Sequence, residues 1–182
     1  MSDSSCLRCG RCCTSFGVCI TPSDIVRIAE DTGREPSSFA ASIPEPPDRE
    51  RNEPSILIDG ERSLIVLKWK EKSDARVCFF YFESDKFGVC ESKNKGCSIY
   101  GSRPFLCRTY PFRKNRNGLC DMRSRSCPTR WSPDDAGKKV YQADLARYEQ
   151  EIGSYNVIAD EWNKKHKGGL EAFLRYICGK QK

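Results

Sequence analysis

The feature that most constrains this chain is a dense group of cysteines. Residues 6–13 read CLRCGRCC, so half of this stretch is thiol, and Cys12 and Cys13 are adjacent. The chain has 12 cysteines among 182 residues, while hydrophobic residues make up only 38% of it. Chains that are poor in apolar residues rely on cross-links or bound metal to replace part of a large core. We therefore expect the cysteines to organise the fold.

The sequence also indicates the compartment in which these cysteines work. No basic start with a following apolar stretch is present, and the longest nearly apolar run, residues 64–67, is too short to span a bilayer. We therefore expect a cytoplasmic protein without a membrane span. Because disulfides are rare in reducing compartments, clustered cysteines there are more often metal ligands or catalytic thiols.

The cysteine spacing bears on the metal. The run from Cys6 to Cys12 is CxxCxxC, the pattern that begins the bacterial ferredoxin signature. That signature ends in a cysteine followed by a proline, and in this chain Cys127 is followed by Pro128. A zinc site of two CxxC pairs would need a second pair farther along, which is absent, and His166 is the single histidine. We expect an iron–sulfur cluster of the [4Fe–4S] type, with all-cysteine zinc as the alternative.

The adjacent pair Cys12 and Cys13 suggests more than one centre. Neighbouring side chains of an extended segment point apart, so they would more easily serve two centres than one. We therefore hypothesise two metal sites that share the loop of residues 6–20.

Capping and turn signals predict the first elements after this loop. Thr21, Pro22 and Asp24 are typical of a helix start, and Gly33 of its end. A second short helix is expected to hold Phe39. The stretches SILI and SLIVLKW predict a hairpin with a four-residue connection at residues 59–62, and residues 77–82 predict one further strand. From residue 88 to 128 we expect mainly loop.

Helical periodicity dominates the C-terminal third. A capped helix is expected from Ser132 to about Ile152, followed by a helix over residues 157–165 and a last helix around residues 170–177. Apolar positions of the first of these helices are expected to share one side, namely Val140, Leu145, Tyr148 and Ile152. The fold class is α+β: a small, irregular, cysteine-rich metal-binding domain over residues 1–131 with a short β-hairpin or sheet, and a helical extension over residues 132–182 packed on it.

Four stretches together resemble a known family. They are CLRCGRCC at residues 6–13, CFF at 78–80, CSIYGSRPFLCRTYPF at 97–112, and Cys127. The chain resembles the YkgJ-like cysteine-cluster family, which is described as zinc- or iron-chelating and carries a CxxCxxCC signature. The flagellin lysine-N-methylases look like relatives of the same group.

The resemblance implies which cysteines are ligands. Eight cysteines fit the shared pattern, and eight is two sets of four; they are Cys6, Cys9, Cys12, Cys13, Cys78, Cys97, Cys107 and Cys127. Cys19, Cys90, Cys120 and Cys178 are extra to the pattern, and Cys178 is expected to be a small core residue of the last helix.

Positive charge is concentrated among these cysteines. The net charge is +6, and residues 103–130 contain eight basic side chains but one acid, Asp121. Arg103 and Arg108 are the best candidates to stabilise a negatively charged cluster. Nucleic-acid binding is disfavoured because no recognised binding module accompanies the basic segment.

Three classes of function remain. The first is an iron–sulfur protein that works in electron transfer or redox sensing, or as an accessory to an enzyme, with a protein partner whose identity the sequence does not give. The second is a zinc-stabilised interaction module. The third, from the family resemblance, is a lysine-methylating enzyme, for which the sequence offers no convincing S-adenosylmethionine site. No nucleotide-binding loop or Ser-His-Asp pattern is present, so the residues alone do not decide whether the protein is an enzyme.

Overall fold

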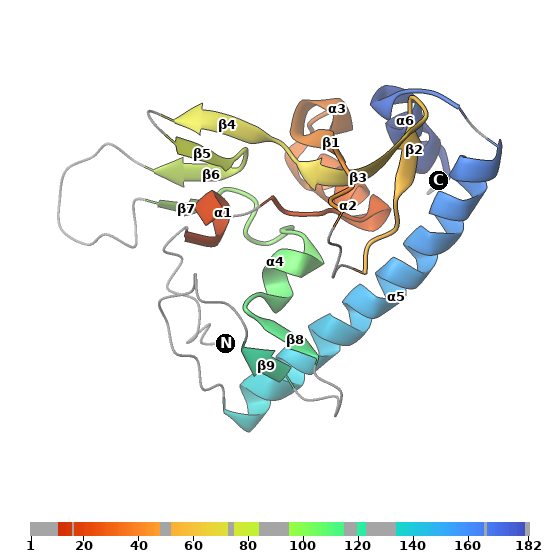
Figure 1. Ribbon diagram of the computed structural model, residues 1–182. Helices are drawn as coiled ribbons and strands as arrows, with labels where there is room; N and C mark the ends of the chain where they lie inside the picture. Colours follow the sequence, from red (N-terminus) through yellow and green to blue (C-terminus); the bar gives the residue numbers. More distant parts are fainter. Residues whose placement is uncertain are drawn as a thin grey trace.

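A computed structural model describes residues 11–15, 17–47, 52–72, 75–83, 95–114, 120–122, 134–165 and 167–180. Within these residues, a three-stranded antiparallel sheet and three two-stranded hairpins are combined with helices (Figure 1). The sheet has the strand order β1–β3–β2. The helices are α1 (Arg11–Ser15), α2 (Pro22–Thr32), α3 (Pro36–Phe39), α4 (Phe105–Thr109), α5 (Asp135–Lys165) and α6 (Leu170–Lys180). The strands are β1 (Ala40–Pro44), β2 (Ile56–Ile58), β3 (Glu61–Leu67), β4 (Trp69–Lys72), β5 (Ala75–Cys78), β6 (Tyr81–Glu83), β7 (Lys95–Cys97), β8 (Phe112–Lys114) and β9 (Cys120–Met122).

Helix α2 begins and ends as its sequence predicts. The Thr21 side chain accepts a hydrogen bond from the Asp24 backbone N–H at 3.1 Å, and the Asp24 carboxylate accepts one from the Thr21 N–H at 3.1 Å. This reciprocal capping box satisfies two donors that a helix start would otherwise leave unpaired. At the other end Gly33 has φ 63°, the left-handed conformation that glycine adopts without a Cβ clash. The short helix α3 follows and ends at Phe39, as expected.

The hairpin of β2 and β3 is present, but its connection is shorter than predicted. Ile58 pairs with Glu61, so only Asp59 and Gly60 lie between the strands. Their φ values are 51° and 87°. Two consecutive left-handed residues form the tight turn whose twist matches that of the flanking strands, so Glu61 and Arg62 join the strand.

Residues 77–82 do not form one strand, which corrects the prediction. Strand β5 ends at Cys78, and β6 begins at Tyr81. Between them, Phe79 and Phe80 form a turn. A continuous strand would send adjacent rings to opposite faces. The turn instead places Phe80 in the core with Phe79 packed beside it, their rings edge to face at 5.1 Å. The chain from 88 to 128, expected to be mainly loop, contributes β7, α4, β8 and β9.

The two helices expected over residues 132–152 and 157–165 are one continuous helix, α5. Buried side chains recur at helical spacing across the expected break, at Ile152, Tyr155 and Ala159, and packing therefore favours an unbroken helix. Leu145 and Tyr148 are buried as predicted, but Val140 is 51% exposed. It lies in the first turns of α5, outside the buried stretch. The last helix, α6, is where the periodicity predicted it.

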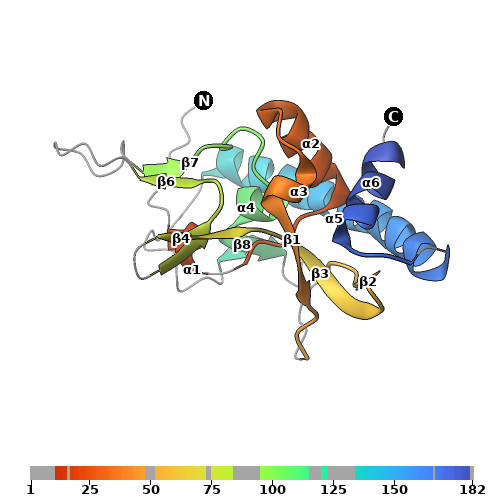
Figure 2. The same cartoon turned by 90° about the horizontal axis from the view of Figure 1, so that it is seen from above.

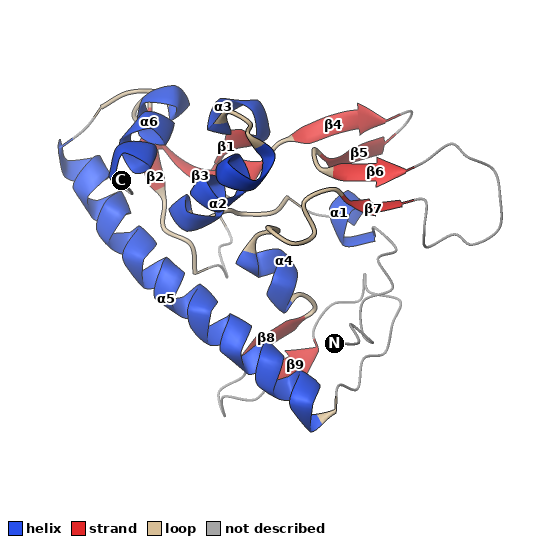
Figure 3. Cartoon of the chain, turned by 180° about the vertical axis from the view of Figure 1, so that it is seen from behind, coloured by secondary structure: helices blue, strands red, loops and turns tan. Residues whose placement is uncertain are grey.

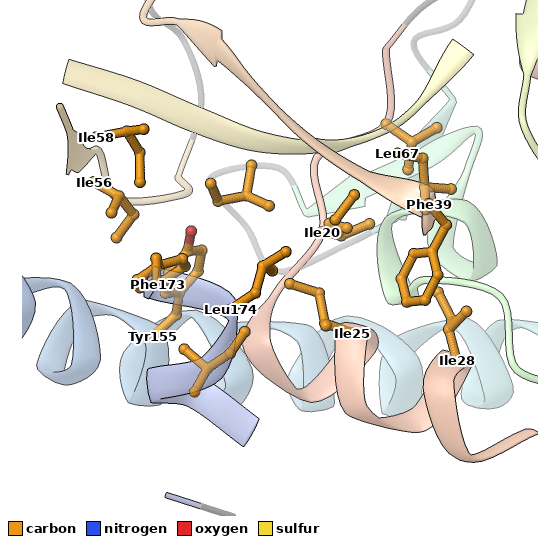
Figure 4. Packing of buried hydrophobic residues seen from close by; sticks show 14 of the residues in the cluster. Ile20, Ile25, Ile28, Phe39, Ile56, Ile58, Leu67, Tyr155, Phe173 and Leu174 are labelled. Carbon is orange, nitrogen blue, oxygen red and sulfur yellow. The ribbon is translucent and has the colours of Figure 1, made fainter. Parts of the chain in front are cut away.

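One hydrophobic core joins the sheet to the helices (Figure 4). It contains Ile25 and Ile28 of α2, Phe39, and Tyr155 of α5, with Phe173 of α6. Seen from above and from behind, α6 and the C-terminal part of α5 lie on the side of the sheet where β2 forms its edge (Figures 2 and 3). The hairpins β4–β5 and β6–β7 extend away from the sheet in the opposite direction. The fold is therefore α+β as predicted; the boundary at residue 131 lies outside the described residues and stays a prediction. No described helix is both long enough and apolar enough to cross a bilayer.

Candidate metal centre

Five cysteines from four separate elements line one narrow cavity. They come from α1, β5, β7 and α4, and are Cys12, Cys13, Cys78, Cys97 and Cys107. We call this the sulfur cavity. Its volume is about 30 Å³, and its other walls are Val18, Leu67, Ile99, Pro104 and Tyr110. The cavity is thus apolar apart from its thiols, with no histidine or carboxylate among the described residues that line it.

Strand pairing positions two of these thiols. Cys78 is the last residue of β5, opposite Trp69, and Cys97 is the last residue of β7, opposite Tyr81. The turn after Cys78 leads directly into β6, the partner of β7, and Ser98 donates its backbone N–H to the Phe80 carbonyl at 2.9 Å. The two hairpins are therefore linked side by side, which brings both strand ends to the same cavity.

Helix α4 positions Cys107. The Cys107 N–H donates to the Pro104 carbonyl at 2.9 Å in the first turn of the helix. The Phe105 N–H donates to the Asp24 carboxylate at 3.2 Å, which ties the start of α4 to the start of α2. Asp24 is fully buried, and burial raises its carboxyl pKa although the Arg27 guanidinium beside it lowers it. A buried carboxylate thus holds the helix that carries Cys107.

The adjacent pair Cys12 and Cys13 acts as one unit. The segment is helical, not extended, so the premise that the two side chains point apart is wrong. Their Sγ atoms are 4.0 Å apart, and both line the sulfur cavity. The hydrogen bond between the two thiols lowers the pKa of the Cys12 thiol to about 7 and raises the pKa of Cys13. The pair therefore holds one thiolate and one proton near neutral pH, and it no longer argues for two separate centres.

The other three thiols are neutral in the folded protein. Burial raises the pKa of Cys78 to about 11 and also raises the pKa of Cys97 and of Cys107. The neighbouring sulfurs add to the effect, because each thiolate would repel the others. Such a group is stable as thiols but can hold several thiolates only if a cation neutralises them.

Arg103 and Arg108, both predicted to stabilise a cluster, lie in different surroundings. The positive charge of Arg103 adds to the lowering of the Cys12 pKa and opposes the burial that raises the pKa of Cys97, and its guanidinium lies 3.6 Å from the centre of the Tyr100 ring. Arg108 instead donates to the carbonyls of Arg103 at 3.1 Å and Gly101 at 2.5 Å. Arg103 thus acts electrostatically on the thiols, and Arg108 holds the loop between β7 and α4.

The remaining cysteines fall into two groups. Cys19 is buried against Leu64 and Val66, and Cys178 packs on the main core as predicted; neither lines the sulfur cavity. The others lie in segments that the structure does not describe in full. Cys6, Cys9, Cys90 and Cys127 are outside the described residues, and of Cys120 only the backbone in β9 is described.

The donor set fits a thiophilic metal. Among the described residues, no three His, Cys, Asp or Glu side chains already stand as a group able to hold one ion. A metal would therefore have to draw the thiols of the sulfur cavity together. Thiolate ligands in an apolar pocket suit iron–sulfur clusters and zinc, whereas magnesium and calcium require oxygen ligands.

Sequence reasoning missed Asp24 and the apolar walls of the cavity. The sequence showed Asp24 only as the residue at position N3 of a capping box. Its bond to Phe105, 81 residues away, had no local signal. Val18 and Leu67 were likewise seen only as apolar residues, because nothing in their spacing indicates a shared cavity.

A known protein family matches the larger part of the chain. Residues 5–128 match the sequence profile of the CxxCxxCC family, which is described as "Putative zinc- or iron-chelating domain". No curated protein and no solved structure matched the chain.

Proposed function

The chain belongs to the CxxCxxCC family of zinc- or iron-chelating domains, and on this premise we propose that its sulfur cavity holds an iron–sulfur centre. The proposed role is electron transfer, redox sensing or service as an accessory to an enzyme. The observation that carries the proposal is that five cysteines from four separate segments of the chain line one apolar cavity.

The number of thiols favours a centre with more than one metal atom. A structural zinc ion takes four ligands in a tetrahedron. The cavity already has five cysteines, and Cys6, Cys9 and Cys127 are predicted to be ligands as well. Iron–sulfur clusters are held by cysteine thiolates almost alone, and when bound they accept and donate single electrons.

The surroundings of the thiols support a redox role. Val18, Leu67 and Ile99 are almost fully buried, so they exclude water from this side of the cavity. Low solvent access and nearby positive charge both alter the reduction potential of a cluster. Arg103 supplies such a charge, since it favours the thiolate forms of Cys12 and Cys97.

A zinc-stabilised interaction module is the second candidate, and the small size of the sulfur cavity favours it. A volume of about 30 Å³ is room for only two or three water-sized particles, each of which needs about 10–15 Å³. A single ion would enter with little displacement of the walls, whereas a cluster requires the thiols to move apart first. Metal analysis separates these candidates.

The test is the iron, zinc and acid-labile sulfide content of protein purified without oxygen. We expect iron and sulfide in similar amounts together with visible absorption. Zinc without sulfide would replace the proposal by the zinc module, and the absence of both metals would refute both.

Two matched variants identify the ligands. Cys107 and Cys178 are both half-buried, but only Cys107 lines the sulfur cavity. Cys107→Ser is expected to lower iron and sulfide content severalfold, and Cys178→Ser to leave both unchanged. Full metal content in Cys107→Ser would remove Cys107 from the ligand set.

A further inference from the structure

A second, larger cavity lies behind the strands that carry two of the thiols. Its volume is about 430 Å³, within the range typical of small-molecule sites. The residues that matter for its chemistry are Arg34, Lys70, Phe79, Phe80, Ser98 and Ile99. We call it the cationic pocket.

The cationic pocket shares a wall with the sulfur cavity. Ile99 lines both cavities. Phe79 directly follows Cys78, and Ser98 directly follows Cys97, so the chain passes from one cavity to the other within one residue. The Ser98 N–H and hydroxyl both donate to the Phe80 carbonyl, at 2.9 and 3.1 Å, which fixes this wall. A molecule in the cationic pocket would therefore contact the residues that directly follow two predicted ligands in the chain.

The lining combines apolar rings with positive charge. Phe80 and Ile99 are 4% and 2% exposed and form an apolar surface, with the half-buried ring of Phe79 beside them. Arg34 and Lys70 are exposed, and none of the described lining residues is acidic. A pocket of this kind selects a ligand with a flat apolar body and a negative charge.

Local structure places the two cations. Gly33, with φ 63°, ends α2 and turns the chain so that Arg34 comes over Phe79, with the guanidinium 5.6 Å from the ring centre. Lys70 lies in β4, next to the strand that ends in Cys78, and pairs with Val77 of that strand.

From these observations we propose that the cationic pocket binds a small planar organic anion, such as an aromatic carboxylate, beside the metal centre. The apolar surface accepts the ring, and Arg34 and Lys70 attract the anionic group. This ligand site goes beyond the proposed function. It rests on that function only in one respect, namely that the neighbouring sulfur cavity holds a metal centre.

Calorimetric titration of the full chain, purified without oxygen, with 2-naphthoate tests the proposal. We expect a Kd of about 1 mM or tighter, a value typical of a ligand of this size. The neutral isostere 2-naphthamide is expected to bind at least about threefold more weakly, because it lacks the charge that the two cations recognise. Equal affinity for the two probes, or no binding of 2-naphthoate, would overturn the proposal.

Two variants and one control locate the binding. Arg34→Gln and Lys70→Gln are each expected to weaken 2-naphthoate binding about threefold to tenfold, since each removes one exposed charge. Both side chains are exposed, so the fold should tolerate the changes. Lys138→Gln, an exposed cation on α5, should leave the affinity unchanged. Unchanged affinity in both pocket variants would place the anion elsewhere and refute the proposal.

Two further readouts distinguish a planar-anion pocket from a simple anion site and from the metal centre itself. Inorganic phosphate should not compete with 2-naphthoate, and competition at equal concentrations would show a simple anion site and refute the planar ligand.

Metal and sulfide are measured on the same samples. If 2-naphthoate binds in an Arg34-dependent way to protein without an iron–sulfur centre, the pocket is supported and the proposed function is refuted. If the centre is intact and 2-naphthoate does not bind, the proposed function is supported and the pocket is refuted.

Discussion

At the scale of single residues, the adjacent thiols Cys12 and Cys13 determine the acid–base behaviour of the site. Because the hydrogen bond between the two thiols lowers the pKa of Cys12 to about 7, Cys12 ionises near neutral pH, whereas Cys78 and Cys107 stay protonated. An incoming cation therefore meets one thiolate first, and the others lose their protons as the metal binds. Metal uptake should release protons and weaken as the pH falls.

The pH profile of alkylation tests this view of Cys12. In metal-free protein, alkylation of Cys12 should accelerate as the pH rises through about 7, because only the thiolate reacts. Cys13→Ala removes the donor and should move the midpoint upward, toward that of an ordinary cysteine. Peptide mass spectrometry over a pH series measures both, with Cys178→Ala as the control. An unchanged midpoint in Cys13→Ala would contradict the shared-proton account.

The two arginines predicted beside the site should differ in effect. Arg103→Gln removes a charge that favours the thiolate forms of Cys12 and Cys97, so the pH midpoint for alkylation of Cys12 should rise. In protein that holds the iron–sulfur centre, the same change should lower the reduction potential. Arg108→Gln removes two hydrogen bonds to loop carbonyls and should cost roughly 1–2 kcal/mol of unfolding free energy, with a smaller change in the midpoint. If both variants shift the midpoint equally, Arg103 has no special electrostatic role.

At the scale of elements, the site depends on the joint between α2, α4 and α5. Asp24 accepts from the first residue of α4, and Thr21 donates its hydroxyl to Glu151 of α5 at 2.6 Å. Arg27 completes the joint by pairing with both Asp24 and Glu151. A polar group buried at this depth is stable only while its partners stay in place, so the joint fixes α4 and with it Cys107.

Asp24→Ala is the sharpest test of this joint. It removes three hydrogen-bonding contacts of a buried carboxylate and should lower the free energy of unfolding by about 2–4 kcal/mol. Asp135→Ala, at the exposed start of α5, should change it by less than about 0.5 kcal/mol. Urea denaturation measures both. A loss below about 1 kcal/mol for Asp24→Ala would show that α4 is held by other contacts.

Much of the element pattern followed from the sequence because its signals are local. The capping box of α2, Gly33 at its end and the buried side of α6 depend on neighbouring residues only. The errors came from contacts between distant segments. Burial of Ile152, Tyr155 and Ala159 stabilises α5 as one helix across its expected break, and Phe80 packs into the core from a turn where a strand was expected. The family pattern indicated that Cys12, Cys78, Cys97 and Cys107 are ligands, but it did not predict that they line one cavity, since their separations along the chain carry no geometric information.

At the scale of the whole molecule, the sulfur cavity is attached to a core that the C-terminal helices complete. Cys78, Leu67 and Ile99 belong to the same buried cluster as Trp162 and Phe173. Trp162 donates its indole N–H to the Leu57 carbonyl at 2.8 Å and packs edge to face on Phe173 at 5.2 Å. Stability of the helices and of the metal site should therefore be coupled.

Two variants on α5 test this coupling. Trp162→Ala should cost about 3–5 kcal/mol and lower the amount of metal that the purified protein retains, because it opens a cavity in the shared core. Val157, on the same helix, is 67% exposed, and Val157→Ala should stay within about 0.5 kcal/mol of wild type. Denaturant unfolding with metal analysis gives both quantities. Full metal retention in a strongly destabilised Trp162→Ala would show that the site folds independently of the helices.

The central claim is that thiols from distant segments converge on one metal centre. The most direct measurement is the X-ray absorption spectrum of the metal in protein purified without oxygen, recorded at the edge of iron or zinc. We predict a first shell of sulfur alone, at about 2.3 Å, with a second shell of metal atoms if the centre is a cluster. Nitrogen or oxygen as the main first-shell ligands would contradict the claim.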